Sequence, residues 1–267
     1  MLALRILSIV FPVFAIIGIG YLYGRVKRPD IGVTNQISMD VLVPALVFAA
    51  LASKDFDFAH YWQLALGGAV VILGSGLLAW PVARILKVDA KTFVPPMMFN
   101  NSGNMGIPLI VLAFGDAALG AAIILFLVEM VLHFSMGPYM LAHRMNLLQL
   151  LKTPVMAATV LGVAVSLSNT VLPAPLYTAI KMVGDASIPM LLFALGVRLN
   201  QVSFKDWHIG AWSGVVAPAT GVIMVLVVTP FLGLDPLQQS ILLVFGALPP
   251  AVLNYLMAEQ YRQEPEK

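Results

Sequence analysis

Three asparagines and a serine lie inside a long apolar run, where polar side chains are expensive to bury. The run covers residues 94–115 and is long enough to cross a membrane as one helix. Asn, Ser, Gly and Pro are poor helix formers, and unpaired amides are costly in hydrocarbon. The pattern therefore predicts an interrupted helix whose break is buried in protein or lines a wet cavity. The interrupting string is Asn100, Asn101, Ser102, Gly103, Asn104, Met105, Gly106, Ile107 and Pro108.

Such a break could bind a charged solute through the backbone. An interrupted helix leaves free N–H groups at one end and free carbonyl groups at the other. The N–H end attracts an anion, while the carbonyl end suits a cation. An alternative is that these residues only kink the helix and hydrogen-bond to neighbouring helices. The candidate substrate-binding residues are Asn100, Asn101, Ser102, Gly103 and Asn104.

A second candidate break lies in the apolar run over residues 237–258. Pro249 and Pro250 remove two backbone donors in the middle of this run, which must distort a helix there. Asn254 follows one turn later, and it could serve the site or simply bond a neighbouring helix. We expect the two breaks to meet near the bilayer midplane, so all three residues join the candidate substrate site.

Two ionisable residues stand four positions apart in the apolar run over residues 117–141. Glu129 and His133 would share one face of a helix. Ionisable groups inside a membrane are functional candidates by default. They could relay a proton, or they could pair with each other and brace the bundle.

Two further carboxylates each precede a proline by four residues. Asp40 precedes Pro44, and Asp185 precedes Pro189. Each could bind a coupling cation or cap the half-helix beside its proline. Lys181 lies four residues before Asp185, so we prefer a simple intrahelical ion pair for that carboxylate.

The composition indicates that lipid is the solvent for most of the surface. The 267 residues are 60% hydrophobic and 10% charged, with a mean hydropathy of +0.92, whereas soluble domains are about 45–50% apolar and about 25% charged. The apolar runs are continuous, which favours helices over the alternating strands of a barrel. We therefore expect an all-α membrane protein. The net charge of +2 and the lack of cysteine argue against a nucleic-acid partner and a thiolate metal site, and we expect no cofactor.

The spacing of charged breaks predicts nine spans, and the basic residues between them predict which loops face the cytoplasm. Only Arg5, Lys54 and Lys181 of the 15 basic residues fall outside every second loop and the C-terminal tail. Because positive charge stays cytoplasmic, loops 1–2, 3–4, 5–6 and 7–8 should face inward and the N-terminus outward. The predicted spans are 4–24, 34–53, 61–86, 94–115, 117–141, 153–173, 175–199, 207–233 and 237–258.

Short similarities between the halves predict an internal repeat. The segment 43–51 resembles 188–196, and the pair Pro12 and Gly20 matches Pro154 and Gly162. Five helices per unit, an odd number, would insert the second unit upside down, as in many secondary transporters. We expect a first repeat over 1–141 and a second over 142–267. The sequence stops where a tenth helix would begin, which predicts either a truncated chain or a shortened protein.

Two of these strings, with the ending of the ninth span, carry a family resemblance along essentially the whole chain. The string 101–108 and the string 184–196 resemble signatures of the auxin efflux carrier family, which includes plant auxin exporters and bacterial malonate and malate permeases. The prolines 249–250 followed by 257–261 resemble its ninth-helix ending. The resemblance implies inverted five-helix repeats with crossed discontinuous helices, an architecture shared with sodium–proton antiporters and bile-acid symporters. It also implies a scaffold from helices 1, 2, 6 and 7, a transport domain from helices 3–5, 8 and 9, and Asn101, Asn104 and Pro249 or Pro250 near a bound carboxylate.

The leading functional hypothesis is a secondary active transporter for small mono- or dicarboxylates in the inner (plasma) membrane. Alternating access would be driven by a proton or sodium gradient, since no nucleotide-binding loop is present. One alternative is a sensor or structural homologue without transport. Another is a membrane enzyme using Glu129 and His133, which the lack of a nucleophile motif or metal cluster disfavours. A homodimer is compatible with the sequence, which does not itself fix the oligomeric state.

Overall fold

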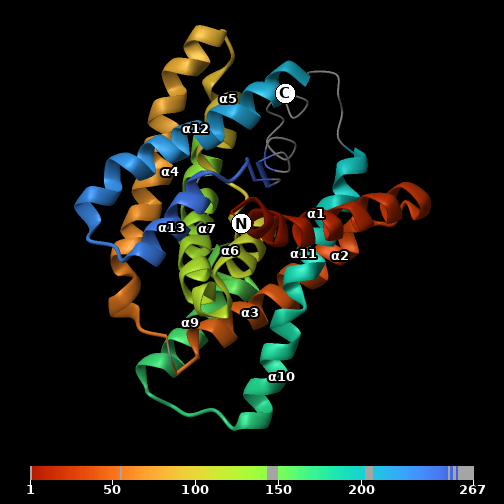
Figure 1. Ribbon diagram of the computed structural model, residues 1–267, viewed down its shortest axis with the longest axis vertical. Helices are drawn as coiled ribbons and strands as arrows, with labels where there is room; N and C mark the ends of the chain where they lie inside the picture. The colour runs from red at the N-terminus through yellow and green to blue at the C-terminus, as the bar shows by residue number, and fades with distance from the viewer. Residues whose placement is uncertain are drawn as a thin grey trace. The chain divides into compact units, whose positions relative to one another are not determined.

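The computed structural model describes residues 2–54, 56–142, 150–201, 207–251, 253, 254 and 257, and within them it contains helices and no strand (Figure 1). Several helices start with a proline or a capping aspartate or threonine where the chain leaves a loop. Thr153, for example, accepts a hydrogen bond from the Met156 N–H at the start of α9. The helices are α1 (Leu2–Lys27), α2 (Ile31–Ile37), η1 (Ser38–Leu42), α3 (Val43–Leu51), α4 (Phe58–Leu86), α5 (Ala90–Met98), η2 (Ser102–Gly106), α6 (Ile107–Phe114), η3 (Asp116–Ala118), α7 (Leu119–Ala142), α9 (Pro154–Leu167), α10 (Ala174–Asp185), α11 (Ser187–Arg198), η4 (Leu199–Gln201), α12 (Trp207–Leu232) and α13 (Pro236–Gly246).

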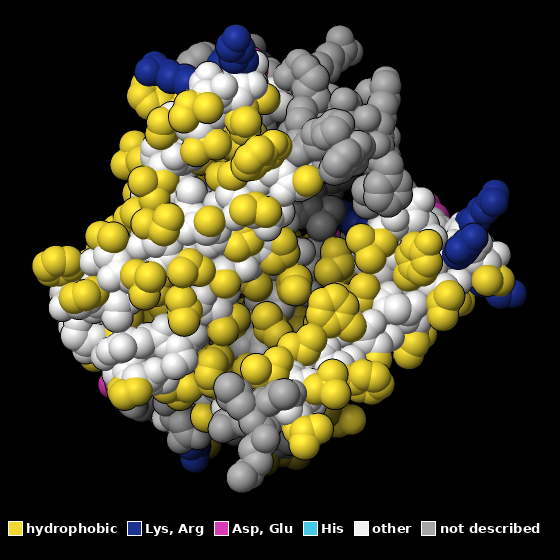
Figure 2. Space-filling model, turned by 45° about the horizontal axis from the view of Figure 1, so that its top comes forward, with side chains coloured by type: hydrophobic (Ala, Val, Ile, Leu, Met, Phe, Trp, Pro, Cys, Tyr) yellow, Lys and Arg dark blue, Asp and Glu magenta, His cyan; other side chains and the backbone are white. Residues whose placement is uncertain are grey.

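Six stretches of the described chain are helical, long and apolar enough to cross a membrane. Their outward side chains are apolar too, with Phe11, Leu77 and Phe231 exposed by 65%, 74% and 85%. Figure 2 shows hydrophobic side chains spread across the described surface in that view, with Lys and Arg at its edges. Water would not tolerate such a surface, so this is a multi-pass membrane protein. The six stretches are Ile6–Lys27, Ile31–Leu51, Phe58–Leu86, Asp116–Ala142, Ala174–Arg198 and Gly210–Leu232.

The remaining three predicted spans, 94–115, 153–173 and 237–258, contain shorter helices. The predicted end of the sixth span was wrong, because α9 ends at Leu167 rather than at residue 173. Asn169 has a left-handed φ of 51°, and the Ser168 N–H bonds back to the Ala164 carbonyl. Such an αL residue terminates a helix, and Pro173 lies beyond it. Hydropathy continues past this signal, which is why the predicted span was too long.

Prolines distort three of the helices in the turn upstream of the ring. A proline lacks an N–H and its ring crowds the carbonyl of residue i−4, so the turn before it must widen or break. The π-helix η1 precedes Pro44, and the π-helix η2 precedes Pro108. The break at Ala186 between α10 and α11 precedes Pro189.

The chain folds as two compact units, of which the first holds residues 1–58, 107–123 and 148–202. Within it α1 packs against α11 so closely that a Cβ on Gly20 would meet the Phe193 carbonyl, and one on Gly196 would meet the Ile17 carbonyl. Close approach of backbones at small residues is the usual way in which membrane helices associate. Tyr177 on α10 also donates to the Ala49 carbonyl on α3, at 3.1 Å.

The second unit holds residues 59–106, 124–147 and 203–267, and it contains the candidate site. Its helices are α4, α5, η2, most of α7, α12 and α13. Gly221 of α12 lies against the Gly246 carbonyl of α13, and Gly68 of α4 lies against Leu125 of α7. The inverted repeat over 1–141 and 142–267, and the scaffold and transport roles of the helices, stay predictions.

Candidate functional site

The helix predicted over 94–115 is interrupted where the asparagines lie, as expected. α5 ends at Met98, and Phe99 takes an extended conformation with φ −96° and ψ 104°. Helical structure resumes at Ser102. The predicted break in 237–258 is also present, because α13 ends at Gly246 and the next helical residues described are 253 and 254.

The two interruptions pair with each other. The Asn101 N–H donates to the Pro249 carbonyl at 2.8 Å, and the Ala251 N–H donates to the Phe99 carbonyl at 2.9 Å. These bonds make an antiparallel bridge between Asn100 and Pro250. Each interruption thus satisfies backbone groups that the other has freed, which hydrocarbon could not do. We call residues 99–101 and 249–251 the crossing.

Two of the predicted site asparagines hold the crossing together. The Asn100 side chain donates through Nδ2 to the Phe245 carbonyl at 2.8 Å. The Asn254 side chain donates through Nδ2 to the Phe99 carbonyl at 2.9 Å. Both residues are buried, and each Oδ1 lacks a hydrogen-bond partner in the described part of the chain. Their NH₂ groups are therefore committed to backbone carbonyls, whereas two acceptors remain free.

The donors that remain free lie at the start of η2. Within the described residues, no acceptor bonds the N–H groups of Ser102, Gly103 and Asn104, and the first bond of the resumed helix joins the Met105 N–H to the Asn101 carbonyl at 3.1 Å. The side chains of Asn101 and Asn104 also form no hydrogen bond there. Asn101 directly precedes η2, and Asn104 lies in its first turn. Gly103 and Asn104 are partly accessible although most of their neighbours are buried.

Close packing against α7 favours a glycine at position 103. A Cβ there would come within 3.1 Å of the Phe126 ring of α7. A larger residue would push the start of η2 away from α7, so Gly103 keeps the free N–H groups in place.

Glu129 and His133 do face each other on α7, 3.5 Å apart between the Glu129 Oε1 and the His133 Nδ1. They are exposed by only 5% and 2%. The Ser102 hydroxyl donates to the other carboxylate oxygen of Glu129. The His133 ring stacks on Phe99, with centroids 4.2 Å apart and planes inclined by 4°.

Asp40 and Asp185 lie in the first unit, and both are exposed. The ion pair preferred for Asp185 is confirmed, with 2.7 Å between its Oδ2 and the Lys181 Nζ. Neither carboxylate caps the half-helix beside its proline, because the residues in the capping positions are Leu42 and Ala186. A role for either in binding a coupling ion stays a prediction.

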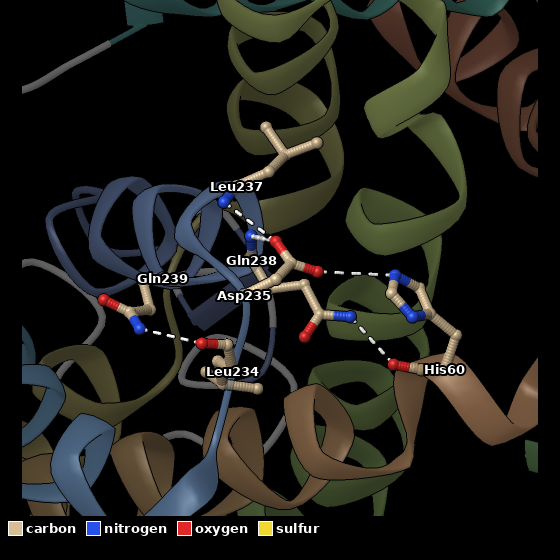
Figure 3. A network of polar contacts seen from close by, with 6 residues as sticks. All are labelled: His60, Leu234, Asp235, Leu237, Gln238 and Gln239. Atoms are coloured by element: carbon tan, nitrogen blue, oxygen red, sulfur yellow. Dashed lines mark hydrogen bonds and ion pairs between the residues drawn. The ribbon is translucent and has the colours of Figure 1, made fainter.

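Polar contacts anchor the N-terminal end of α13 to the start of α4 (Figure 3). Asp235 accepts from the N–H groups of Leu237 and Gln238, and its Oδ2 lies 3.4 Å from the His60 Nε2. The buried Gln238 side chain donates to the His60 carbonyl at 2.7 Å. The cap is worth about 0.5–2 kcal/mol, whereas an exposed pair such as His60 and Asp235 contributes about 0–1 kcal/mol. Capping therefore dominates.

Sequence reasoning missed Phe99, which builds the site, and the role of Asp235 as the cap of α13. The Phe99 carbonyl accepts two hydrogen bonds, and its ring stacks on His133. From the sequence, however, a phenylalanine in an apolar run cannot be distinguished from a packing residue. Asp235 could have been found, because an Asp followed by Pro236 is a common start for a helix.

An open pocket lies at the cytoplasmic end predicted for α1 and is made by the first unit alone. It contains none of the residues predicted to bind substrate. Two arginines give it a basic character, so it is the natural competitor for an anion. Its lining residues are Gly24, Arg25, Arg28, Pro29, Val197 and Asn200.

A bundle of apolar helices with two paired interruptions defines a multi-span membrane protein of the transporter class. The model of the membrane transport protein family matches residues 5–144 and 138–267, so the chain belongs to this auxin efflux carrier-like family. The family resemblance of the sequence is thereby confirmed.

Two relatives align along most of their length. The chain is 26% identical over 283 residues to a protein of Rhizobium meliloti named "Putative malonate transporter", covering 96% of this chain and 87% of the relative. It is 20% identical over 278 residues to an uncharacterized transporter of Methanocaldococcus jannaschii, covering 96% and 89%.

Proposed function

We propose that this protein is a secondary active transporter that moves small mono- or dicarboxylates across the inner membrane by alternating access. The observation that carries the proposal is the set of free donors at the start of η2, beside the crossing. Membership of the transport family and the name of the Rhizobium relative support a carboxylate such as malonate as cargo.

The chemistry of the free donors suits a carboxylate. The N–H groups of Ser102, Gly103 and Asn104 begin a helical stretch that runs to Phe114, whose dipole places about half a positive charge at this end. Hydrogen bonds to a charged group contribute about 1.5–3 kcal/mol each. The Asn101 and Asn104 amides, which lie just before and within the first turn of η2, would add further donors. The anion needs no fixed cationic side chain, which keeps the empty site inexpensive inside a membrane.

The proposed orientation places the N-terminus outside, with loops 1–2, 3–4, 5–6 and 7–8 in the cytoplasm. Arg144 and Lys205, which belong to two of these loops, lie outside the described residues. The chain contains no cysteine, so single cysteines can be labelled without a background. Arg28→Cys should react with an impermeant maleimide only from the cytoplasmic side, and Val171→Cys only from outside. The opposite pattern would reverse the topology.

Malonate counterflow in proteoliposomes tests the function. Counterflow needs no driving gradient, so it reports substrate passage alone. The purified wild-type protein should exchange labelled malonate for unlabelled malonate. Asn104→Asp replaces a donor by a negative charge next to the bound carboxylate, and we expect exchange to fall by about tenfold or more, which corresponds to about 1.4 kcal/mol.

The matched control is Asn169→Asp, the same change at an exposed turn of the first unit where Asp also tolerates the left-handed conformation. It should exchange malonate like the wild type. Full activity of both Asn104→Asp and Asn101→Ala would show that the site lies elsewhere. Malonate binding without any exchange would favour the sensor alternative and refute the carrier.

A further inference from the structure

We propose that Glu129 and His133 together form a buried proton-binding site that couples proton uptake to binding of the anion. This inference rests on the proposed function, and it decides between the two coupling ions that the sequence leaves open. The ligand is one proton, carried inward together with the carboxylate.

The net charge of this buried pair depends on whether it holds one added proton. With a neutral imidazole and an ionised carboxylate, the pair carries one net negative charge in a site that is almost inaccessible to water. One added proton gives either an imidazolium with a carboxylate or two neutral groups, and both forms have zero net charge. Burying a net charge costs several kcal/mol more than burying a neutral pair. The geometry of the pair therefore suits a site in which one proton is shared between two buried groups.

The described side chains in contact with the pair are not ionisable. α7 contributes Phe134, η2 contributes Ser102, the end of α5 contributes Phe99, and the segment after α13 contributes Met257, whose sulfur lies beside His133 at Gly137. None of these four side chains titrates between about pH 5 and 8. Within the described chain, neither Glu129 nor His133 hydrogen-bonds or ion-pairs with any titratable side chain except the other.

The pair touches the interrupted helix on both sides of its break. Ser102, the first residue after the break, uses its hydroxyl on Glu129 while its N–H is one of the free donors. Phe99, the residue before the break, stacks on His133 and accepts two hydrogen bonds at the crossing. Ser102 thus lies between the buried Glu129 carboxylate and the proposed anion site.

This placement fixes the sign of the coupling. An ionised Glu129 repels a carboxylate that binds at the Ser102 N–H, and a proton on the pair removes that repulsion. Anion binding must then favour proton uptake by the same factor by which the proton favours anion binding. Malonate should bind more tightly as the pH falls, by up to about tenfold per pH unit where one proton is linked.

The test compares the wild type with Glu129→Gln, which imitates the protonated carboxylate. Malonate affinity is measured by isothermal titration between about pH 5 and 8, the range in which histidine titrates, and uptake is measured in proteoliposomes with an acidic outside. The wild type should bind more tightly at low pH and accumulate malonate. Glu129→Gln should bind tightly with little dependence on pH, keep counterflow, and lose accumulation driven by the pH gradient. Titration of malonate itself is common to both proteins and cancels in the comparison.

Asp116→Asn is the control, because it removes an exposed carboxylate of the first unit and should leave gradient-driven accumulation intact. If Glu129→Gln does not fold, His133→Gln provides the second comparison and should also lose accumulation while keeping counterflow. Accumulation by both Glu129→Gln and His133→Gln at the wild-type level would overturn the proton site. A wild-type protein that performs counterflow but does not accumulate malonate under a pH gradient would also overturn it. Absence of any wild-type malonate counterflow would instead overturn the proposed function.

Discussion

At the scale of single residues, the asparagines divide into two groups with different roles. The NH₂ groups of Asn100 and Asn254 donate to backbone carbonyls across the crossing. Those of Asn101 and Asn104 make no hydrogen bond within the described residues. An amide suits both tasks because it carries donors and an acceptor without a charge. The same residue type therefore holds the interruption together and offers groups to a solute.

Asn254→Ala should destabilise the second unit. The change leaves the Phe99 carbonyl with one hydrogen bond instead of two and opens a small gap, at a cost of about 1–3 kcal/mol. Thermal unfolding in detergent should show a lower midpoint. Gln36→Ala, at an exposed helical site whose side chain makes no hydrogen bond to the described residues, should leave the midpoint unchanged. Equal midpoints for wild type and Asn254→Ala would mean that the amide does not support the crossing.

The polar residues of the candidate site could be located from the sequence, but their hydrogen-bond partners could not. Polar residues at bilayer depth are conspicuous because each has a high cost, which is why Asn100 to Asn104, Glu129 and His133 were found. The partners of Asn100 and Asn254 are backbone carbonyls 145 and 155 residues away in the chain. No spacing rule reaches across such distances, so only the fold distinguishes a committed amide from a free one.

At the scale of helices, proline and glycine do complementary work. Prolines at positions 44, 108 and 189 widen or break the turn upstream of the ring, and this effect is local enough to be predicted from sequence. Glycines let helices approach, and that depends on which helix lies opposite. The contact of Gly221 with the Gly246 carbonyl could not be foreseen, whereas the break at Pro249 and Pro250 could.

Gly221→Ala should disrupt the packing of α12 on α13. The added methyl group would overlap the Gly246 carbonyl, and a backbone atom cannot turn aside as a side chain can. We expect a loss of at least about 1–3 kcal/mol, typical of overpacking, and a lower unfolding midpoint. Gly214→Ala on the same helix meets nothing within 4 Å, so it should be neutral or slightly stabilising. Similar midpoints for the two variants would contradict the close contact.

At the scale of the whole molecule, the sequence gives the class of protein from composition alone, since so apolar a surface belongs in lipid. Most predicted spans match long helices, and the discrepancy at α9 arises because hydropathy does not register an αL cap. The proposed transport depends on one feature: two interrupted backbone segments that pair with each other and leave the N–H groups at the start of η2 free to bind an anion.

A structure with bound bromomalonate tests this feature most directly, because anomalous scattering locates the bromine without reference to side chains. We predict a carboxylate with oxygens about 2.7–3.2 Å from the backbone nitrogens of Ser102, Gly103 and Asn104, the normal hydrogen-bond range. The bromine found instead only in the pocket beside Arg25 and Arg28, with the start of η2 unoccupied, would contradict the account.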